Sequence, residues 1–313
     1  MAYFKKGDIV RLQDKTVVMI LELIGSGQQG DVYKAYDRVR KCYVAVKHCY
    51  GSYVNNKDKF YEKVKIMADH RPPDDRLCWP TGVSQLTGDK CFLYVMPLLE
   101  GYRPFTGLVT NKDSVTMEQK VKILNQAAQV IQNLHKQSLI YGDISDKNLL
   151  YRVEADGSVD VRFIDCDNIT LPGFSLGVQG TGKYRAPELL LPDPDRSDGR
   201  PQCPSQKSDD FGFSVLAFRV LMRRHPLDGT LARTKRADDY EGFLEYYGRN
   251  PRFIFDGQSN APSDNIVRKW RALPEPMKIF FRCAFRQEAL KDKHARPDMA
   301  AFLRCLSLAY KFI

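Results

Sequence analysis

The sequence lacks several features that would assign the chain to a membrane, secreted or fibrous class. No apolar run approaches the roughly 20 residues that a transmembrane helix needs, and residues 1–6 contain no apolar signal core. There is also no internal repeat and no low-complexity segment. We therefore expect a soluble, cytoplasmic protein that does not associate with membranes.

Cysteine spacings typical of metal sites or disulfide frameworks are absent too. The chain has 8 cysteines, but none forms a C-x-x-C pair and none accompanies paired histidines. This scatter predicts reduced thiols in the core instead of a disulfide framework or a zinc site. The cysteines are Cys42, Cys49, Cys78, Cys91, Cys166, Cys203, Cys283 and Cys305.

Composition and charge narrow the class further. Of 313 residues, 43% are hydrophobic and 27% are charged, which excludes a collagen-like, coiled-coil or wholly disordered chain. With 48 Lys and Arg against 38 Asp and Glu, the net charge of +10 suits an anionic partner such as a nucleotide, an acidic protein or a nucleic acid. Because no long basic tract or interleaved aromatic pattern is present, nucleic-acid binding is unfavoured.

Secondary-structure patterns change near residue 101. β-rich runs come first, interrupted by one helical pattern at residues 58–69; helical periodicity follows, with a candidate capping box at Thr116 and Gln119. Residues 209–222 are apolar almost all round, as in a helix through the middle of a domain. We predict an α+β fold with a small β-rich lobe, a hinge and a larger helical lobe. These parts are residues 1–97, 98–101 and 102–313. The β-rich runs are residues 17–21, 43–46 and 91–96.

A glycine-rich segment in the first part has the composition of a phosphate-binding loop. Gly25, Gly27 and Gly30 lack Cβ atoms, so backbone N–H groups could approach phosphate oxygens closely. A dinucleotide site requires a helix directly after the glycines, whereas Val32 begins a strand-like run. This context favours a hairpin that covers a nucleotide.

A lysine follows at the end of the next predicted strand. Lys47 comes 17 residues after the last glycine, where it could reach the α- and β-phosphates. Such a lysine needs a carboxylate partner, and Glu62 is the best candidate because Ile66, one turn later, is apolar and could anchor the helix inward. Motif spacing also allows Lys63 to occupy the acidic position.

Motifs in the second part resemble those of eukaryotic-type (Hanks-type) serine/threonine protein kinases. The catalytic loop is matched by Tyr-Gly-Asp-Ile-Ser-Asp-Lys-Asn at residues 141–148, and the metal-binding segment by Ile-Asp-Cys-Asp at 164–167. The end of the activation segment is matched by Gly-Thr-Gly-Lys-Tyr-Arg-Ala-Pro-Glu at 180–188. The resemblance extends over residues 17–310.

The resemblance implies a bilobal kinase fold with an ATP cleft between the lobes. Asp143 is expected to orient a substrate hydroxyl and accept its proton, Lys147 to reach the γ-phosphate, and Asn148 and Asp165 to bind Mg²⁺. The implied nucleotide-binding residues are Gly25, Ser26, Gly27, Gly30, Val32, Ala45, Lys47, Glu62, Met96, Pro97, Leu99 and Leu150.

Two further acidic residues are expected to act structurally. Glu188 is expected to pair with Arg296, and Asp209 to accept backbone hydrogen bonds from the catalytic loop. Thr181 favours serine/threonine specificity, and its hydroxyl is expected to touch Asp143.

Departures from the family pattern carry their own predictions. Gly142 stands where the family usually has arginine, so a phosphate on the activation segment would lose its partner. We therefore expect activity that does not depend on phosphorylation of the activation segment. Removing the hydroxyls of Thr170, Ser175 and Thr181 should then leave phosphate transfer intact. Thr181 is the ambiguous position, because its hydroxyl is expected to touch Asp143. The Tyr-Gly-Asp and Ile-Asp-x-Asp motifs also resemble divergent bacterial kinases encoded beside PP2C-type phosphatases and von Willebrand A-like proteins, which are possible partners besides a protein substrate.

Three alternatives remain open at this point. The chain could be a pseudokinase scaffold that binds nucleotide, or a basic polyanion-binding module. It could also be a small-molecule phosphotransferase of the aminoglycoside or choline kinase type, although those enzymes lack the segment matched at residues 180–188.

Overall fold

The computed structural model divides the chain into two compact units. Unit 1 comprises Met1–Tyr102 and Phe163–Asp167, and unit 2 comprises Arg103–Arg162 and Asn168–Ile313. We predicted a single division at residues 98–101, which did not anticipate that Phe163–Asp167 belongs to unit 1. The predicted lobe boundaries stay a prediction. The structure describes residues 3–27, 29–50, 56–174, 180–231, 239–257 and 260–311.

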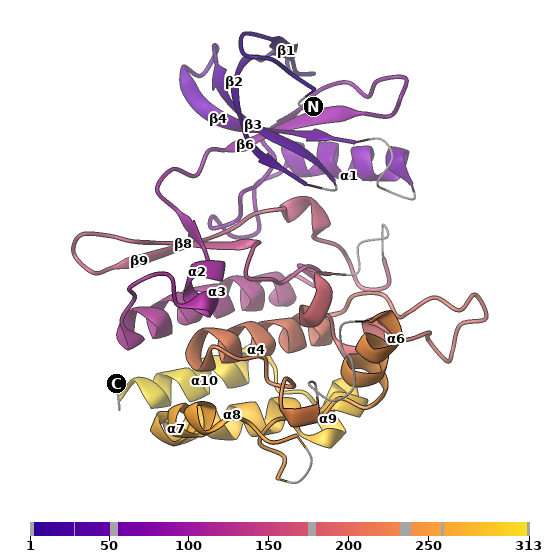
Figure 1. Cartoon of the computed structure of the whole chain (residues 1–313). Coiled ribbons are helices and arrows are strands. Elements are labelled where there is room, and N and C mark those ends of the chain that lie inside the picture. Colours follow the sequence, from indigo (N-terminus) through magenta and orange to yellow (C-terminus); the bar gives the residue numbers. More distant parts are fainter. Residues whose placement is uncertain are drawn as a thin grey trace. The chain divides into compact units, whose positions relative to one another are not determined.

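Unit 1 contains a six-stranded antiparallel sheet in the order β1-β2-β3-β4-β6-β5 (Figure 1). Burial alternates along β3, as expected for a strand with one face on a core. Val18, Ile20, Tyr33, Ala35 and Val46 form the centre of this core. The strands are β1 (Ile9–Arg11), β2 (Val17–Ser26), β3 (Gly30–Asp37), β4 (Cys42–Cys49), β5 (Gly82–Val83) and β6 (Phe92–Pro97).

Helix α1 (Lys57–Asp69) packs on this sheet through an apolar stripe. Phe60 and Val64 lie one turn apart and are buried, and the ring of Phe60 lies 5.6 Å from that of Phe92 in β6. The Asn56 side chain caps the helix by accepting a hydrogen bond from the backbone of Lys59. The expectation that Ile66 anchors the helix inward is wrong, because its side chain is 58% exposed.

Unit 2 is mainly helical and includes a small sheet in the order β7-β8-β9. The predicted capping box at Thr116 and Gln119 is present at the start of α3, with both reciprocal hydrogen bonds formed. The elements are β7 (Arg103–Pro104), α2 (Thr106–Thr110), α3 (Met117–Lys136), β8 (Leu149–Val153), β9 (Val159–Phe163), α4 (Gln206–Met222), α6 (Tyr240–Phe243), α7 (Asp264–Ala272), α8 (Glu275–Phe285), α9 (Gln287–Lys291) and α10 (Met299–Tyr310).

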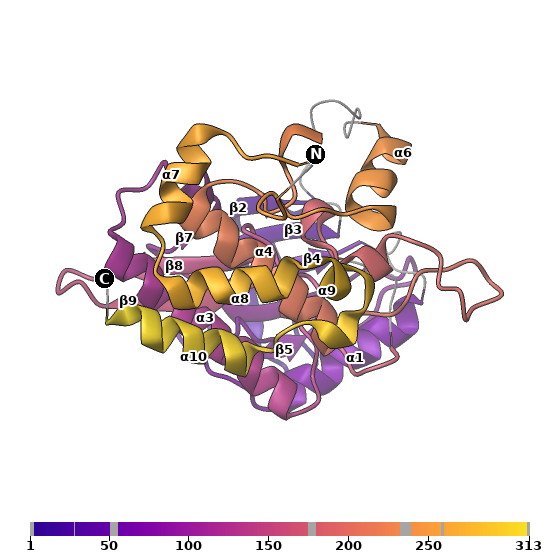
Figure 2. The same cartoon turned by 90° about the horizontal axis from the view of Figure 1, so that it is seen from below.

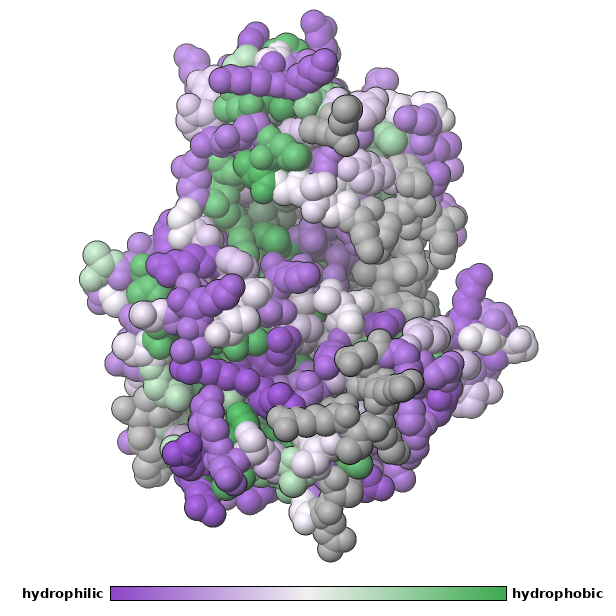
Figure 3. All heavy atoms as spheres, viewed as in Figure 1, coloured by the Kyte–Doolittle hydropathy of each residue, from purple (hydrophilic) through white to green (hydrophobic). Residues whose placement is uncertain are grey.

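Helix α4 forms the centre of unit 2, as its all-round apolar sequence predicts. The ring of Phe218 lies 5.1 Å from Phe281 and 5.8 Å from Phe253, and the ring of Phe213 lies 5.1 Å from Phe302. Helices α8 and α10 lie side by side, as Figure 2 shows. On the face drawn in Figure 3, hydrophilic residues predominate over unit 2. Within the described ranges, no helix combines the length and apolarity needed to cross a bilayer.

The cysteine prediction is confirmed in part. All eight cysteines are free, but only Cys49, Cys78 and Cys166 are buried. Cys42 is exposed and the remaining cysteines are half-buried, so they are not core residues. The sequence spacing identified reduced thiols but could not tell which strand face or helix face each one occupies.

Candidate active site

The glycine-rich segment forms the turn between β2 and β3, as the hairpin prediction required. Gly30 is fixed by packing, since a Cβ at this position would lie 1.9 Å from the carbonyl oxygen of His48. A Cβ on Gly25 or Gly27 would meet nothing closer than 3.8 Å or 3.9 Å. Packing within unit 1 therefore does not explain these two glycines, whereas close approach by a ligand would. Gln28 lies outside the described residues.

Strand register brings several predicted nucleotide-binding residues together in unit 1. Gly25 of β2 pairs with Val32 of β3, and Val32 pairs in turn with Lys47 of β4. Ala45 lies two residues from Lys47, on the same face, and pairs with Met96. The register thus places these five predicted residues on one face of the sheet.

The remaining predicted nucleotide contacts of unit 1 lie around the ends of these strands. The hydroxyl of Ser26 donates a 2.6 Å hydrogen bond to Asp31, which ties the turn to β3. Pro97 is exposed, while Leu99 is half-buried. The thiol of Cys78 donates a hydrogen bond of 3.3 Å to the carbonyl oxygen of Pro97. That carbonyl already has a partner within unit 1.

Lys47 is the centre of a buried charge cluster. The residue is 3% exposed, and its Nζ lies 2.8 Å from Asp167 Oδ2 and 3.0 Å from Asp165 Oδ1. Gln29 Oε1 accepts a third hydrogen bond at 3.2 Å. Burial alone would lower the pKa of Lys47, but the charges of Asp167 and Asp165 outweigh it and hold the pKa above its ordinary value.

The predicted Lys47–Glu62 pair is wrong. Glu62 is exposed to solvent, and the two carboxylates beside Lys47 come from the segment after β9. Lys63, the alternative position, faces this cluster and donates a hydrogen bond to the backbone carbonyl of Asp167. Burial lowers the pKa of Lys63 to about 8. Helical phase decides the outcome, since adjacent residues of a helix point about 100° apart.

The segment Phe163–Asp167 is anchored to unit 1 by its backbone. Phe163 N donates to Arg76 O at 2.9 Å, and Cys78 N donates to Phe163 O at 2.7 Å. Asp165 adopts φ +52°, a left-handed conformation that aspartate tolerates better than most residues. The turn leaves the Asp165 side chain 33% exposed, whereas that of Asp167 is fully buried.

In unit 2, Asp143 is held by two side chains. The residue is 9% exposed, and it accepts hydrogen bonds from Thr181 Oγ1 at 2.6 Å and from Asn148 Nδ2 at 2.9 Å. The expected contact between Thr181 and Asp143 is confirmed. Both amide hydrogens of Asn148 point to Asp143, because Nδ2 also donates to the Asp143 carbonyl at 2.9 Å.

The backbone of the loop at residues 141–148 is held by Asp209, in the first turn of α4. Asp209 accepts hydrogen bonds from Tyr141 N at 2.8 Å and Gly142 N at 3.0 Å, as predicted. Gly142 has φ +80°, a conformation that L side chains rarely adopt. Lys147 is exposed and Leu150 is half-buried, so the predicted roles of these two residues stay predictions.

The predicted structural pair of Glu188 and Arg296 is present in unit 2. Arg296 Nη1 and Nη2 lie 2.6 and 2.7 Å from the two carboxylate oxygens of Glu188. Arg296 is 4% exposed, and its Nε donates to the carbonyl of Ala289 at 2.8 Å. This bidentate geometry ties the 180–188 segment to the C-terminal helices.

The predicted metal ligands provide a suitable donor set. Asp165 offers carboxylate oxygens on a partly exposed side chain. Asn148 donates hydrogen bonds to Asp143 through Nδ2, so its amide oxygen can serve as a metal ligand. Oxygen donors are the ones Mg²⁺ prefers. The residues therefore fit the predicted ion by their chemistry.

Sequence reasoning missed the partnership between Lys47 and Asp167. A signal was available, because a lysine stands at position 63, where the motif spacing allows an acid, while Asp167 adds a carboxylate where the family has glycine. Considered together, these two departures indicate an exchange of charges between the helix and the metal-binding segment.

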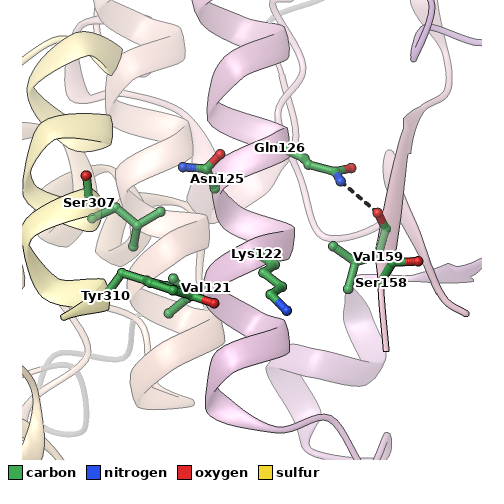
Figure 4. Close-up of a pocket in the computed structure, with 9 residues that line it drawn as sticks. Val121, Lys122, Asn125, Gln126, Ser158, Val159, Ser307 and Tyr310 are labelled. Carbon is green, nitrogen blue, oxygen red and sulfur yellow. Dashed lines mark hydrogen bonds between the residues drawn. The ribbon is translucent and has the colours of Figure 1, made fainter. Parts of the chain in front are cut away.

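A separate pocket of about 430 Å³ lies in unit 2 between α3, α10 and the β8–β9 hairpin (Figure 4). Gln126 Nε2 donates to Val159 O at 2.7 Å along one wall. Among the described residues, no carboxylate, histidine or cysteine lines it, so it lacks the side chains that most often bind metal ions. Its lining residues are Val121, Lys122, Asn125, Gln126, Ser158, Val159, Leu306, Ser307 and Tyr310.

Comparison with known proteins identifies similar sequences. The family described as protein kinase domain matches residues 18–300. The serine/threonine-protein kinase PknD of Chlamydia pneumoniae is 25% identical over 288 residues, which cover 82% of this chain and 27% of that protein. PknD proteins of Chlamydia caviae and Chlamydia felis are 26% and 25% identical, each over 66% of this chain and 24% of their own length. The chain thus spans about a quarter of the curated relatives it matches.

Proposed function

This chain belongs to the protein kinase family, and on that premise we propose that it transfers the γ-phosphoryl group of ATP to a serine or threonine hydroxyl of a protein, with Mg²⁺ as cofactor. The observation that carries the proposal is the hydrogen-bonded set around Asp143 in unit 2. A buried carboxylate held by Thr181 and Asn148, on a loop fixed by Asp209, is organised for proton transfer.

The reaction divides between the residues of the two units. Asp143 orients the substrate hydroxyl and accepts its proton while the hydroxyl oxygen bonds to phosphorus and the bond to ADP breaks. Lys47 and the open backbone at Gly25 and Gly27 hold the phosphates. Asn148 and Asp165 would each offer an oxygen ligand to Mg²⁺, which would supply charge neutralisation for the phosphate oxygens.

We propose that this activity does not depend on phosphorylation of the activation segment. An arginine at position 142 would have to adopt φ +80°, where L side chains are strained. The loop is instead positioned through its backbone by Asp209. Of the three predicted hydroxyl positions, Thr170 and Thr181 are described, and Ser175 lies outside the described residues.

Serine/threonine specificity and the partners are also part of the proposal. The chlamydial relatives are serine/threonine-protein kinases by name, and this similarity together with the Thr181–Asp143 hydrogen bond supports a serine or threonine acceptor. The resemblance to kinases encoded beside PP2C-type phosphatases and von Willebrand A-like proteins supports those two classes as partners. The cytoplasmic location stays a prediction.

The test is transfer of radiolabelled phosphate from [γ-³²P]ATP to a panel of acceptors. The panel contains proteins rich in Ser/Thr or in Tyr, together with an aminoglycoside and choline. Label on protein serine or threonine that requires Mg²⁺ and disappears in Asp143→Asn supports the proposal. Label on a small molecule alone, or nucleotide binding without transfer to any acceptor, contradicts it.

A further inference from the structure

We propose that Asp167, and not an acidic residue of α1, is the carboxylate that positions Lys47 for the nucleotide phosphates. In this arrangement Lys63 of α1 holds Asp167 through its backbone carbonyl. The inference deepens the proposed function and rests on it. Asp167 acts here as a positioning residue, because it works through Lys47.

Exposure distinguishes the two carboxylates that contact Lys47. The Asp165 side chain is 33% exposed, so it can turn toward a metal ion, whereas that of Asp167 is fully buried. Lys47 is the ion-pair partner of Asp167, and Asp167 Oδ1 is buried without a hydrogen-bond partner among the residues that the structure describes. A buried carboxylate with one satisfied oxygen is costly unless a charge partner stabilises it. Asp167 therefore stays with Lys47 when Asp165 binds a metal ion.

Helix α1 supplies no competing carboxylate. Its three acidic residues, Asp58, Glu62 and Asp69, are all exposed, and Asp58 pairs with Lys90 at 2.7 Å. The residue of α1 that reaches the cluster is Lys63, which carries the opposite charge and donates to Asp167 O. The charges on the helix and on the segment after β9 are thus exchanged relative to the Lys47–Glu62 arrangement that we expected from the sequence.

One consequence concerns which part of unit 1 controls Lys47. Asp165 and Asp167 lie on the same five-residue segment, whose backbone is bonded to Arg76 and Cys78. The lysine, its counter-ion and the predicted metal ligand are therefore held by one anchored segment. A displacement of α1 would break the hydrogen bond from Lys63 to Asp167, while the segment would keep its backbone bonds to Arg76 and Cys78.

A charge-exchange series tests this inference. The single variants Asp167→Asn and Lys63→Glu are compared with the double variant that carries both substitutions, which moves the carboxylate from the segment to the helix. Glu62→Gln tests the alternative partner directly, and Asp69→Asn is the exposed control on the same helix. Each variant is measured for MgADP affinity by calorimetry, for the separate kcat and KM of phosphate transfer, and for its urea unfolding midpoint.

The inference predicts that each single variant weakens MgADP binding and lowers kcat by about a hundredfold, because Lys47 loses its fixed position. The double variant recovers most of the loss, while Glu62→Gln and Asp69→Asn match the wild type. A double variant no better than the worse single variant overturns the inference, as does a loss in Glu62→Gln equal to that in Asp167→Asn. If the wild type neither binds nucleotide nor transfers phosphate, the proposed function itself fails, and the inference fails with it.

Discussion

Replacing Glu188 with Gln removes the charge that Arg296 faces inside unit 2. Arg296 is 4% exposed, and its guanidinium contacts both carboxylate oxygens at 2.6 and 2.7 Å. After the change it keeps the carbonyl of Ala289 at 2.8 Å and the ring of Phe211, 5.1 Å from its central carbon, but none of the described residues offers it a charge partner. Leaving one member of a buried pair uncompensated costs about 3–5 kcal/mol of unfolding free energy.

Equilibrium urea unfolding measures this loss. Trp270 lies in unit 2 and Trp79 in unit 1, so a Trp79→Phe background leaves Trp270 fluorescence as a reporter for unit 2. Asp198→Asn is the matched control, because its partner Arg196 lies 2.5 Å away on the surface of the same unit and solvent screens the pair. The reasoning is refuted if Glu188→Gln and Asp198→Asn lower the unfolding free energy by the same small amount.

Three further predictions concern other residues. His225 is buried, and burial lowers its pKa to about 4, so at this residue the unfolded state binds more protons than the folded state between about pH 6.5 and 4. The contribution of His225 to stability should therefore fall by about 3 kcal/mol as the pH drops through that window. Burial raises the pKa of Asp210 to about 6, which acts in the opposite direction, so the measurement is the difference between the wild type and His225→Gln in a pH series of urea unfolding. Gly30→Ala should disrupt the β2–β3 turn, because the added Cβ would lie 1.9 Å from His48 O, whereas Gly27→Ala should fold normally and weaken only MgATP binding; equal thermal stability of the two variants would contradict this. Thr116→Ala removes the α3 capping box and should cost about 1 kcal/mol in urea unfolding, and a change near zero would count against the cap.

Much of the fold follows from local patterns. The turn at Gly25–Gly30, the cap at Thr116 and the all-apolar helix through Phe213 each depend on residues close together in the sequence. Strand register then follows from alternation along β3 and β4, which is why Val32 and Lys47 fall opposite each other.

The part of the site that sequence reasoning missed depends on helical phase and on distant segments. Glu62 and Lys63 are adjacent, and only the packing of α1 through Phe60 and Val64 decides which of them faces Lys47. Asp167 lies 120 residues after Lys47 in the sequence. No local pattern sets that distance, so the charge exchange becomes visible only in the fold.

The intact mass of the protein after incubation with ATP and Mg²⁺, beside the same measurement on Asp143→Asn, tests the central claim most directly. The account predicts added phosphate in the wild type, mapped to serine or threonine, and none in the variant. Equal phosphate incorporation in both would contradict the assignment of Asp143. Phosphate found on tyrosine alone would contradict the proposed specificity.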